Sequence, residues 1–204
     1  MTTPAVEFWY EFASTYSHVA AQRIEAVARA AGVPIVWRPF LLGPIFRQQG
    51  WNDSPFNLYP AKGAYMWKDL ERQCAKHGVP FRKPSQFPRP SLLATRIALT
   101  LESSPERIGE FVRRVYLANF HDDADTTSND VVRGVLQSMG LPDSDAVLEQ
   151  ATSTQTKERL RARSEEAFAR GVFGAPTFLI GDALYWGNDR LEDALAYCVG
   201  VRSS

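Results

Sequence analysis

The stretch Glu11–His18, with the sequence EFASTYSH, follows a run of aromatic and β-branched residues, Val6–Tyr10, that is typical of a β-strand. Ser14 lies where that strand would pass into a helix, and its side chain suits the N-cap position. A second stretch, Gly171–Ile180 (GVFGAPTFLI), also ends in strand-like residues, with Pro176 at the strand entrance. We expect a cis peptide bond before Pro176 and a position opposite Ser14, so that the two stretches enclose a cleft. An ordinary trans proline at a strand start is the alternative.

Composition and charge narrow the class of protein. The chain has 204 residues, of which 45% are hydrophobic and 23% charged, as in a water-soluble globular protein. Lys plus Arg and Asp plus Glu both number 23, which argues against nucleic acid or an anionic membrane as a partner. No apolar run has the length of a transmembrane helix, and Met1–Pro4 lacks the basic and apolar regions of a signal peptide. We therefore expect a cytoplasmic protein.

The two cysteines, Cys74 and Cys198, do not form a Cys-x-x-Cys pair and fall outside both stretches. This pattern argues against a disulfide scaffold and indicates a reducing compartment. Both cysteines lie in helix-like segments, where we expect them to act as small buried apolar residues.

The order of elements is β-α-β at the start and β-β-α at the end. After Ser14 a helix should run to about Ala31 and end at Gly32, before a strand over Pro34–Pro39. Near the other end, strands over Thr177–Ile180 and Leu184–Trp186 should form a hairpin. A last helix is predicted over 190–199. The middle should be irregular over 40–60 and 78–90, and helical over 61–77, 91–101 (capped by Ser91), 105–120, 128–139 and, with a break near Ser153, 143–170.

This order predicts an α/β protein with the thioredoxin topology and a large helical insertion. The two ends together supply a right-handed β-α-β unit and a hairpin, which is enough for one four-stranded sheet. We expect a discontinuous thioredoxin-like domain over residues 1–45 and 171–204, and a helical insertion domain over residues 46–170.

Ser14 is the first candidate for chemistry. The helix that follows has free backbone N–H groups and a positive dipole end, which favour an anion and a thiolate in particular. The segment holds no cysteine, so dithiol exchange is not available, but a serine hydroxyl can donate to a sulfur supplied by a ligand. A plain N-cap is the alternative. A serine hydrolase using His18 is disfavoured, because no Gly-x-Ser-x-Gly elbow and no third group are evident.

Two other segments could hold parts of a peptide-like ligand. A cis bond would turn the backbone N–H and C=O of Ala175 into the cleft, where an extended ligand could pair with them. Gly187–Arg190 opens the last helix, so its N–H groups could take a carboxylate while Asp189 takes an ammonium. Glutathione carries both groups at its γ-glutamyl end. Helix capping by Asn188 or Asp189 is compatible with that role.

Three cations and one polar run remain open to two interpretations. Lys62, Arg47 and Arg89 lie in or beside the irregular segments, where they could bind a carboxylate or remain plain surface charges. The run 121–125 has metal-binding residue types, but no full ligand set is nearby, so we expect a solvated loop and no metal.

Taken together, the motifs resemble the family of kappa-class glutathione transferases and 2-hydroxychromene-2-carboxylate isomerases, within the disulfide-bond oxidoreductase-like thioredoxin superfamily. They span nearly the whole chain in the right order. The matching segments are 12–17 (FASTYS), 39–43 (PFLLG), 62–66 (KGAYM), 87–88 (FP), 171–178 (GVFGAPTF) and 186–190 (WGNDR). The resemblance implies a thioredoxin-like fold with a helical insertion, a homodimer and glutathione as the cofactor.

The same resemblance implies roles for individual residues. Ser14 matches the catalytic serine, and Ala175 matches the backbone clamp on the cysteinyl unit of glutathione. The implied glutathione-binding set is Ser14, Lys62, Ala175, Trp186, Gly187, Asn188 and Asp189. The candidates for binding an aromatic carboxylate substrate are Arg47, which is favoured, and Asn52, Asn57 and Arg89.

The implied reaction converts 2-hydroxychromene-2-carboxylate to trans-o-hydroxybenzylidenepyruvate, in the breakdown of aromatic hydrocarbons. A glutathione thiolate would add to the substrate, the opened adduct would rotate about a single bond, and elimination would return glutathione. Two departures from the family pattern bear on substrate choice. Thr15 stands where relatives commonly have proline, and Ala175 stands where valine is frequent.

Other functions remain to be separated from this one. A kappa-like transferase or peroxidase would consume glutathione rather than recycle it. A thiol-disulfide oxidoreductase is disfavoured by the missing cysteine pair. A non-catalytic binding module would be indifferent to the loss of Ser14.

Overall fold

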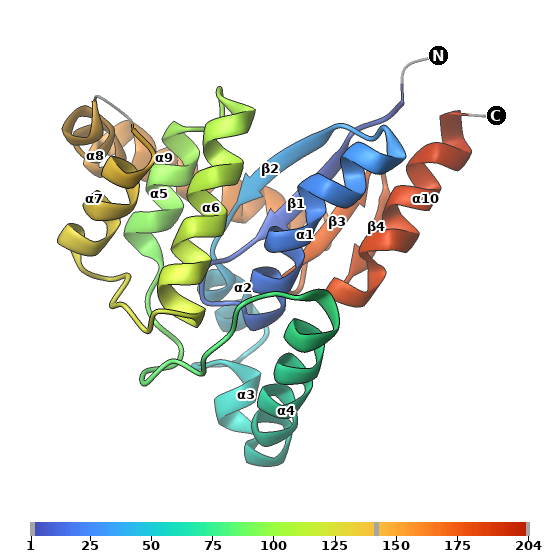
Figure 1. The fold of residues 1–204 in the computed structure, drawn as a ribbon, viewed down its shortest axis with the longest axis horizontal. Coiled ribbons are helices and arrows are strands. Elements are labelled where there is room, and N and C mark those ends of the chain that lie inside the picture. The colour runs from blue at the N-terminus through green and yellow to red at the C-terminus, as the bar shows by residue number, and fades with distance from the viewer. Residues whose placement is uncertain (1–2, 141–142, 203–204) are drawn as a thin grey trace.

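A computed structural model describes residues 3–140 and 143–202. Its centre is one four-stranded sheet in the order β2-β1-β3-β4 (Figure 1). The strands are β1 (Val6–Tyr10), β2 (Ile35–Pro39), β3 (Thr177–Ile180) and β4 (Ala183–Trp186). As predicted, β1 and β2 are parallel and the two ends of the chain share one sheet, in which β3 is antiparallel to β1 and to β4. Met1 and Thr2, part of the stretch considered above for a signal peptide, lie outside the described residues.

Helix α1 (Thr15–Ala31) makes the crossover from β1 to β2 with the predicted boundaries. Ser14 occupies the N-cap position in an extended conformation, and its side chain accepts from the Ser17 N–H. Gly32 ends the helix at φ 66°, a left-handed conformation that glycine adopts without a steric penalty.

The remaining helices form most of the middle of the chain. They are α2 (Leu42–Gln48), α3 (Pro55–Leu58), α4 (Pro60–His77), α5 (Leu92–Thr100), α6 (Pro105–Phe120), α7 (Asn129–Ser138), α8 (Ser144–Thr152) and α9 (Thr154–Ala169). A 3₁₀ turn (Asn188–Arg190) precedes the last helix, α10 (Leu191–Arg202). Among the described helices, none is both long enough and apolar enough to cross a membrane.

The prediction of an irregular segment over 40–60 was wrong in part, because α2 and α3 lie there. The segment is rich in Gly, Pro and Asn, and two of its prolines, Pro44 and Pro55, lie inside these helices. Each lies in the first turn of its helix, where the missing N–H has no partner to lose. The break near Ser153 is confirmed, and that residue caps α9. Ser91 does occupy the N-cap position of α5, but its hydroxyl caps nothing and is used elsewhere.

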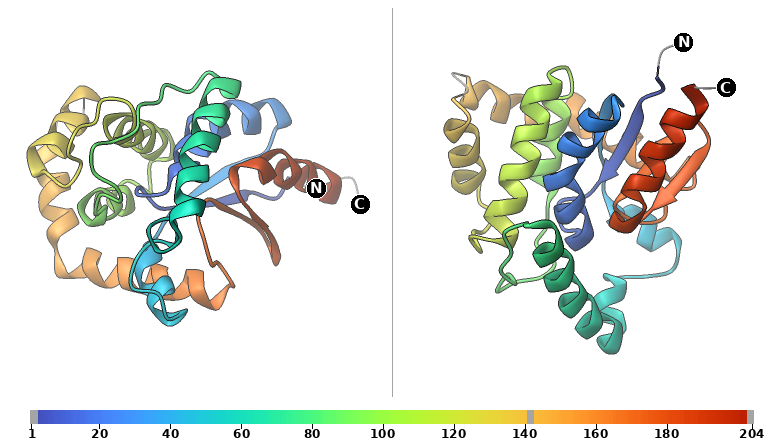
Figure 2. Two further views of the ribbon diagram at one scale, coloured as in Figure 1. Left: turned by 90° about the horizontal axis from the view of Figure 1, so that it is seen from below. Right: turned by 45° about the vertical axis from the view of Figure 1, so that its right-hand side comes forward.

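The sheet has an apolar layer on each face. Phe8 and Tyr10 of β1 and Phe178 of β3 point toward α1, α6 and α10, in a cluster that continues into α5, α7 and α8. Trp9 and Leu179 point to the opposite face, where α2 and α9 cover them. Figure 2 shows α9 across the sheet from α1 and α10.

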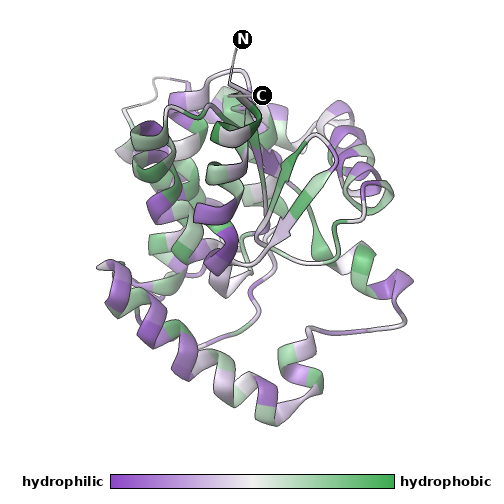
Figure 3. Cartoon of the chain, turned by 90° about the vertical axis from the view of Figure 1, so that its right-hand side faces the viewer, coloured by the Kyte–Doolittle hydropathy of each residue, from purple (hydrophilic) through white to green (hydrophobic). Residues whose placement is uncertain are grey.

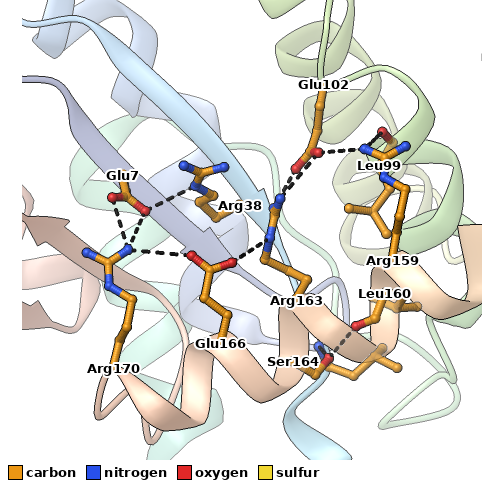
Figure 4. Close-up of polar contacts among 11 residues, drawn as sticks. Glu7, Arg38, Leu99, Glu102, Arg159, Leu160, Arg163, Ser164, Glu166 and Arg170 are labelled. Atoms are coloured by element: carbon orange, nitrogen blue, oxygen red, sulfur yellow. Dashed lines mark hydrogen bonds and ion pairs between the residues drawn. The ribbon is translucent and has the colours of Figure 1, made fainter.

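Helix α9 is attached to the sheet by charge as well as by apolar packing (Figure 4). Glu7 of β1 accepts from Arg38 Nε at 3.0 Å and from Arg170 Nη1 at 2.8 Å. The guanidinium groups of Arg163 and Arg170 lie 5.8 and 5.7 Å from the Trp9 ring centroid. Further pairs continue the network through Glu102, Arg159 and Glu166.

Helix α4 extends beyond the sheet with α3 beside it. Its buried residues, Gly63, Met66, Leu70 and Cys74, recur at helical spacing on one face. Figure 3 shows hydrophilic and hydrophobic residues alternating along it. A Cβ at Gly63 would lie 2.2 Å from the Phe56 carbonyl oxygen, so glycine permits the close approach of α3 to α4.

The central strand should be sensitive to the loss of an aromatic ring. Phe178 is fully buried and stacks on Phe8 at 5.4 Å, so Phe178→Ala should lower the free energy of unfolding by about 3–5 kcal/mol. The control Phe168→Ala, at a side chain that is 48% exposed, should change it by less than about 0.5 kcal/mol. Urea denaturation followed by circular dichroism measures both. Equal losses in the two variants would contradict this account of the core.

Candidate functional site

A large cleft opens at the end of β1 and the start of α1. Its volume is about 1490 Å³, and its wall is mostly apolar. The α2–α3 segment, the start of α4, the loop before α5 and the 173–175 segment close its sides. Of the predicted site residues, it is lined by Ser14, Arg47, Asn52, Lys62, Arg89, Ala175 and Trp186. The other four, Asn57, Gly187, Asn188 and Asp189, do not line it.

Ser14 lies at the junction of the two stretches that decide the fold. Its Oγ donates to the Ala175 carbonyl oxygen at 2.8 Å and accepts from the Ser17 N–H at 3.2 Å. Its own N–H donates to the Glu11 carbonyl at 2.9 Å. The hydroxyl is therefore fixed at the positive end of the α1 dipole, on the wall of the cleft.

The Ala175–Pro176 peptide bond is cis, as predicted. The Pro176 carbonyl accepts from the Gly187 N–H at 2.9 Å, and the Thr177 hydroxyl donates to the Gly174 carbonyl at 2.8 Å. These bonds fix the turn that places Ala175 beside Ser14. A second cis bond, Phe87–Pro88, lies on the cleft wall and was not predicted.

Trp186 covers the same turn from β4. Its indole contacts Phe173 with ring centroids 5.0 Å apart, and both side chains are exposed on the cleft wall. A Cβ at Gly174 would lie 2.4 Å from Trp186 Nε1, so this indole position requires glycine there. The two rings, tilted by 56° to each other, form an apolar part of the cleft wall close to Ala175 in the sequence.

The predicted γ-glutamyl residues lie outside the cleft wall. Asn188 is buried, and its amide oxygen accepts from Arg23 Nη1 at 3.1 Å. Asp189 is exposed and pairs with Arg190 at 3.0 Å. Both are in the 3₁₀ turn rather than at the first turn of α10, which the sequence pattern did not reveal.

Two exposed cations line the cleft from the insertion. Lys62, in the first turn of α4, lies 5.8 Å from the Tyr59 ring centroid, and Arg47 is in the last turn of α2. Neither forms an ion pair with a carboxylate among the described residues. Both remain available to an anionic ligand. Asn52 is exposed nearby on the same wall.

The other two substrate candidates already have partners. The Asn57 amide donates at 3.1 Å to Asp53, which lines the cleft, although Asn57 itself does not. Arg89 is only 4% exposed and is bound to Asp123 and to the side chain of Asn119. Hydrogen bonds from Ser85 and Arg89 lower the pKa of the Asp123 carboxyl to about 2. Arg89 thus attaches the 78–90 loop to the end of α6.

Sequence reasoning assigned no role to Glu11, which lines the cleft and is 7% exposed. One carboxylate oxygen accepts from the Ala13 N–H at 3.1 Å, and the other accepts from the Ser91 hydroxyl. Burial raises the pKa of the Glu11 carboxyl to about 7, and these two hydrogen bonds only partly oppose that effect. An acidic residue directly after a strand and before a helix was the available signal.

The His18 and Tyr16 side chains, close to Ser14 in the sequence, have partners elsewhere. His18 is fully buried, its Nε2 is 3.0 Å from the Pro80 carbonyl, and burial lowers its pKa to about 4. This arrangement gives no support to a Ser14–His18 hydrolase. Tyr16 donates to Asp69 at 2.8 Å, which ties α1 to α4.

The cysteines lie away from the cleft. Both Cys74 and Cys198 are buried and free, as predicted, and neither lines the cleft. Burial raises the pKa of the Cys74 thiol to about 12, so it remains protonated at neutral pH. Among the described residues, no group of three His, Cys, Asp or Glu side chains could hold a metal.

Comparison with known proteins places these features in a family. The sequence model of the DSBA-like thioredoxin domain matches residues 5–198. A 2-hydroxychromene-2-carboxylate isomerase of Sphingobium xenophagum is 30% identical over 197 residues, covering 96% of this chain and 98% of the relative. Glutathione S-transferase kappa 2 of Caenorhabditis elegans is 27% identical over 198 residues, covering 91% and 88%. A solved 2-hydroxychromene-2-carboxylate isomerase structure superposes with a TM-score of 0.86 at 25% identity and 98% coverage of both chains. The predicted thioredoxin-like fold and the family resemblance are confirmed.

The two buried groups with shifted pKa should give opposite pH dependences of stability. The Glu11 pKa is raised from 4.5 to about 7, so its contribution is present below 4.5 and is lost as pH rises toward 7. The His18 pKa is lowered from 6.5 to about 4, so its contribution is present above 6.5 and is lost as pH falls toward 4. Each is worth roughly 3 kcal/mol over its full window, and they oppose each other between pH 4.5 and 6.5.

Single variants should separate the two contributions. In Glu11→Gln, the free energy of unfolding should fall as pH falls from 6.5 toward 4, because the His18 contribution is uncompensated. In His18→Gln it should rise as pH falls from 7 to 4.5. Urea denaturation across this range measures both slopes. Slopes equal to that of the unsubstituted protein in both variants would contradict the assignment.

Proposed function

This chain belongs to the DSBA-like thioredoxin domain family, and from that membership we propose that it is a glutathione-dependent isomerase. The proposed reaction converts 2-hydroxychromene-2-carboxylate to trans-o-hydroxybenzylidenepyruvate. The isomerases among its relatives, at 30% identity and below, support this choice. The observation that carries it is the Ser14 hydroxyl, fixed at the start of α1 and 2.8 Å from the Ala175 carbonyl, in a cleft without a cysteine.

Glutathione would bind with its cysteinyl unit extended along Ala175. The cysteinyl N–H would donate to the Ala175 carbonyl, and the Ala175 N–H would donate to the cysteinyl carbonyl. The Ser14 hydroxyl, which now donates to that Ala175 carbonyl, is released and donates to the sulfur instead. Lys62 would hold the glycyl carboxylate.

The γ-glutamyl end would reach the segment after β4. Trp186 lines the cleft, and Gly187, Asn188 and Asp189 follow it toward α10. Asp189 would take the ammonium group while keeping its present partner Arg190, which contacts only its Oδ2. Asn188 attaches this segment to α1, because its amide oxygen accepts from Arg23.

The start of α1 would lower the pKa of the bound thiol. The thiolate would accept from the Ser14 hydroxyl and lie at the positive end of a 17-residue helix. Ser17 supports that geometry because its N–H fixes the Ser14 oxygen. The sulfur would therefore be ionised at neutral pH, although a free thiol has a pKa of about 8.5.

The substrate would occupy the apolar part of the cleft beyond Ala175. Arg47 would bind its carboxylate, with Asn52 and Arg89 on the same wall. Asn57 would support this wall through its hydrogen bond to Asp53. The thiolate adds to the unsaturated carbon, the ring opens, the new single bond rotates, and elimination of the thiolate leaves the trans double bond. Glutathione is regenerated in each cycle.

A kappa-like transferase or peroxidase is the second candidate. The kappa-class relatives from Caenorhabditis elegans and Homo sapiens, 27% and 26% identical, favour it specifically. Family membership also leads us to propose a homodimer located in the cytoplasm. Analytical ultracentrifugation of the purified protein tests the dimer.

Glutathione balance separates the two candidates. With the chromene carboxylate and less than one equivalent of glutathione, the isomerase should turn over many times while total glutathione stays constant. Product absorbance and a thiol assay measure the two quantities. Loss of one glutathione per product would support the transferase, and no turnover of this substrate would contradict the proposal.

Replacing the Ser14 hydroxyl should raise the pKa of bound glutathione. A hydrogen bond to a charged group contributes roughly 1.5–3 kcal/mol, so Ser14→Ala should move the pH–rate profile upward by about 1–2 pH units. Turnover at neutral pH should fall accordingly. Thiolate ultraviolet absorbance of the complex gives the pKa directly.

A second N-cap serine is the matched control. Ser128 caps α7, outside the cleft, by accepting from the Asp130 N–H. Ser128→Ala should lower stability by about 1 kcal/mol and leave the thiol pKa unchanged. An unchanged profile in Ser14→Ala, or the same shift in both variants, would rule out the role given to Ser14.

A further inference from the structure

We propose that the Glu11 carboxylate receives and holds the thiol proton of glutathione while the sulfur is ionised at Ser14. The inference rests on the proposed function and gives the destination of the proton that thiol ionisation releases. It makes Glu11 an acid–base group of the cleft, a role separate from the hydrogen bond that Ser14 supplies.

The position of Glu11 is fixed by its own backbone. It follows the last residue of β1, and its carbonyl accepts from the Ser14 N–H at 2.9 Å and from the Tyr116 hydroxyl at 2.8 Å. The carboxyl group is thus held on the cleft wall three residues before Ser14. A group attached so firmly to the Ser14 backbone keeps its place relative to the sulfur site.

The hydrogen bonds to the carboxyl group leave it able to bind a proton. The Ser91 hydroxyl donates to one oxygen and the Ala13 N–H to the other. Each carboxylate oxygen has two acceptor sites, so either one can take a proton without losing its present donor. Ser91 stands at the N-cap of α5, yet its side chain caps no helix N–H and donates its hydrogen bond to Glu11 instead.

The surroundings hold no charge that would keep the carboxyl ionised. Within residues 3–140 and 143–202, no cation forms an ion pair with it. The facing group from α6 is the neutral Tyr116 phenol, which donates to the Glu11 carbonyl. Arg89, two residues before Ser91, is turned to Asp123.

Other titratable groups near the cleft are poorly placed for this task. His18 faces Pro80, and the Tyr16 hydroxyl is bound to Asp69. Asp53 is exposed and accepts from Ser54 and Asn57. Lys62, on α4, is an exposed cation, and an ammonium group has no lone pair that could accept a proton.

The transfer balances in atoms and charge. The S–H bond breaks with its electron pair left on sulfur, and the proton forms an O–H bond with a Glu11 oxygen. The cleft carries one negative charge before and after, so the thiolate is not placed beside a second buried anion. Burial raises the pKa of Glu11 to about 7, nearer to the value of about 8.5 of a free thiol, so this transfer is less unfavourable than one to an ordinary carboxylate. The proton returns when glutathione leaves as the thiol.

Counting released protons tests the idea. Glutathione is added to the protein in weak buffer at pH 7.5, an indicator dye reports protons, and ultraviolet absorbance reports thiolate. The unsubstituted protein should release roughly half a proton or less per thiolate, because the carboxylate takes up the rest. Glu11→Gln should release one full proton per thiolate, and Glu11→Asp should restore the lower count.

Two further variants keep the test decisive if Glu11→Gln does not fold. Ser91→Ala removes a hydrogen bond that favours the carboxylate, and so it should raise the pKa of Glu11 further. The pH at which glutathione binding begins to cause proton uptake should therefore increase. Asp53→Asn, at an exposed carboxyl of the same cleft, should keep the count of the unsubstituted protein. A merely structural role for Glu11 would change affinity without changing the number of protons per thiolate.

The outcomes separate this inference from the function on which it rests. A thiolate signal accompanied by one full proton in the unsubstituted protein, Glu11→Asp and Glu11→Gln alike would overturn the role of Glu11 and leave glutathione activation standing. No thiolate signal in any of them would overturn the proposed function, and this inference with it.

Discussion

The antiparallel pairing of β1 with β3 is the constraint on which the rest of the structure depends. It joins Trp9 to Thr177, residues from opposite ends of the chain, and so places the exit of β1 beside the entrance of β3. The Ser14–Ala175 contact, between residues 161 positions apart, exists only in this register. A slip by one residue would turn the apolar side chains of β3 to the other face and separate the two halves of the cleft. The geometry of the site is therefore kept only as long as β1 and β3 remain paired.

The insertion turns this contact into a cleft. Short helices α2 and α3, the start of α4 and the loop before α5 surround Ser14 with an apolar wall. Exposed cations, Arg47 and Lys62, occupy this wall, while the buried Arg89 is neutralised by Asp123. Under the proposed function these cations would attract an anionic ligand from solvent, whereas no cation in the described part of the chain pairs with Glu11 near Ser14. Under the proposed function, the Glu11 carboxyl and the glutathione sulfur would share this centre.

The sequence predicted the parts of this arrangement that depend on local signals. Ser14 and Gly32 mark the ends of α1, and Pro176 at a strand entrance marked the turn opposite Ser14. The short helices over 42–58 were missed, because prolines in a first turn look the same as helix breakers. The burial of Glu11 and the engagement of Asn188 by Arg23 depend on contacts between residues far apart in the chain, which local patterns do not contain. The division of the chain at residues 45 and 170 remains a prediction.

The bond between the Ser14 hydroxyl and the Ala175 carbonyl also acts as a filter. Under the proposed function, a ligand must break this bond before the hydroxyl can serve a sulfur. A peptide thiol replaces what it breaks, because its own amide takes the carbonyl. Hydrogen sulfide or a simple alkyl thiol brings no such amide and leaves a carbonyl unpaired, at a penalty of roughly 1–3 kcal/mol. Under the proposed function, this contact would therefore disfavour small sulfur nucleophiles relative to peptide thiols before any of them reaches the reacting carbon.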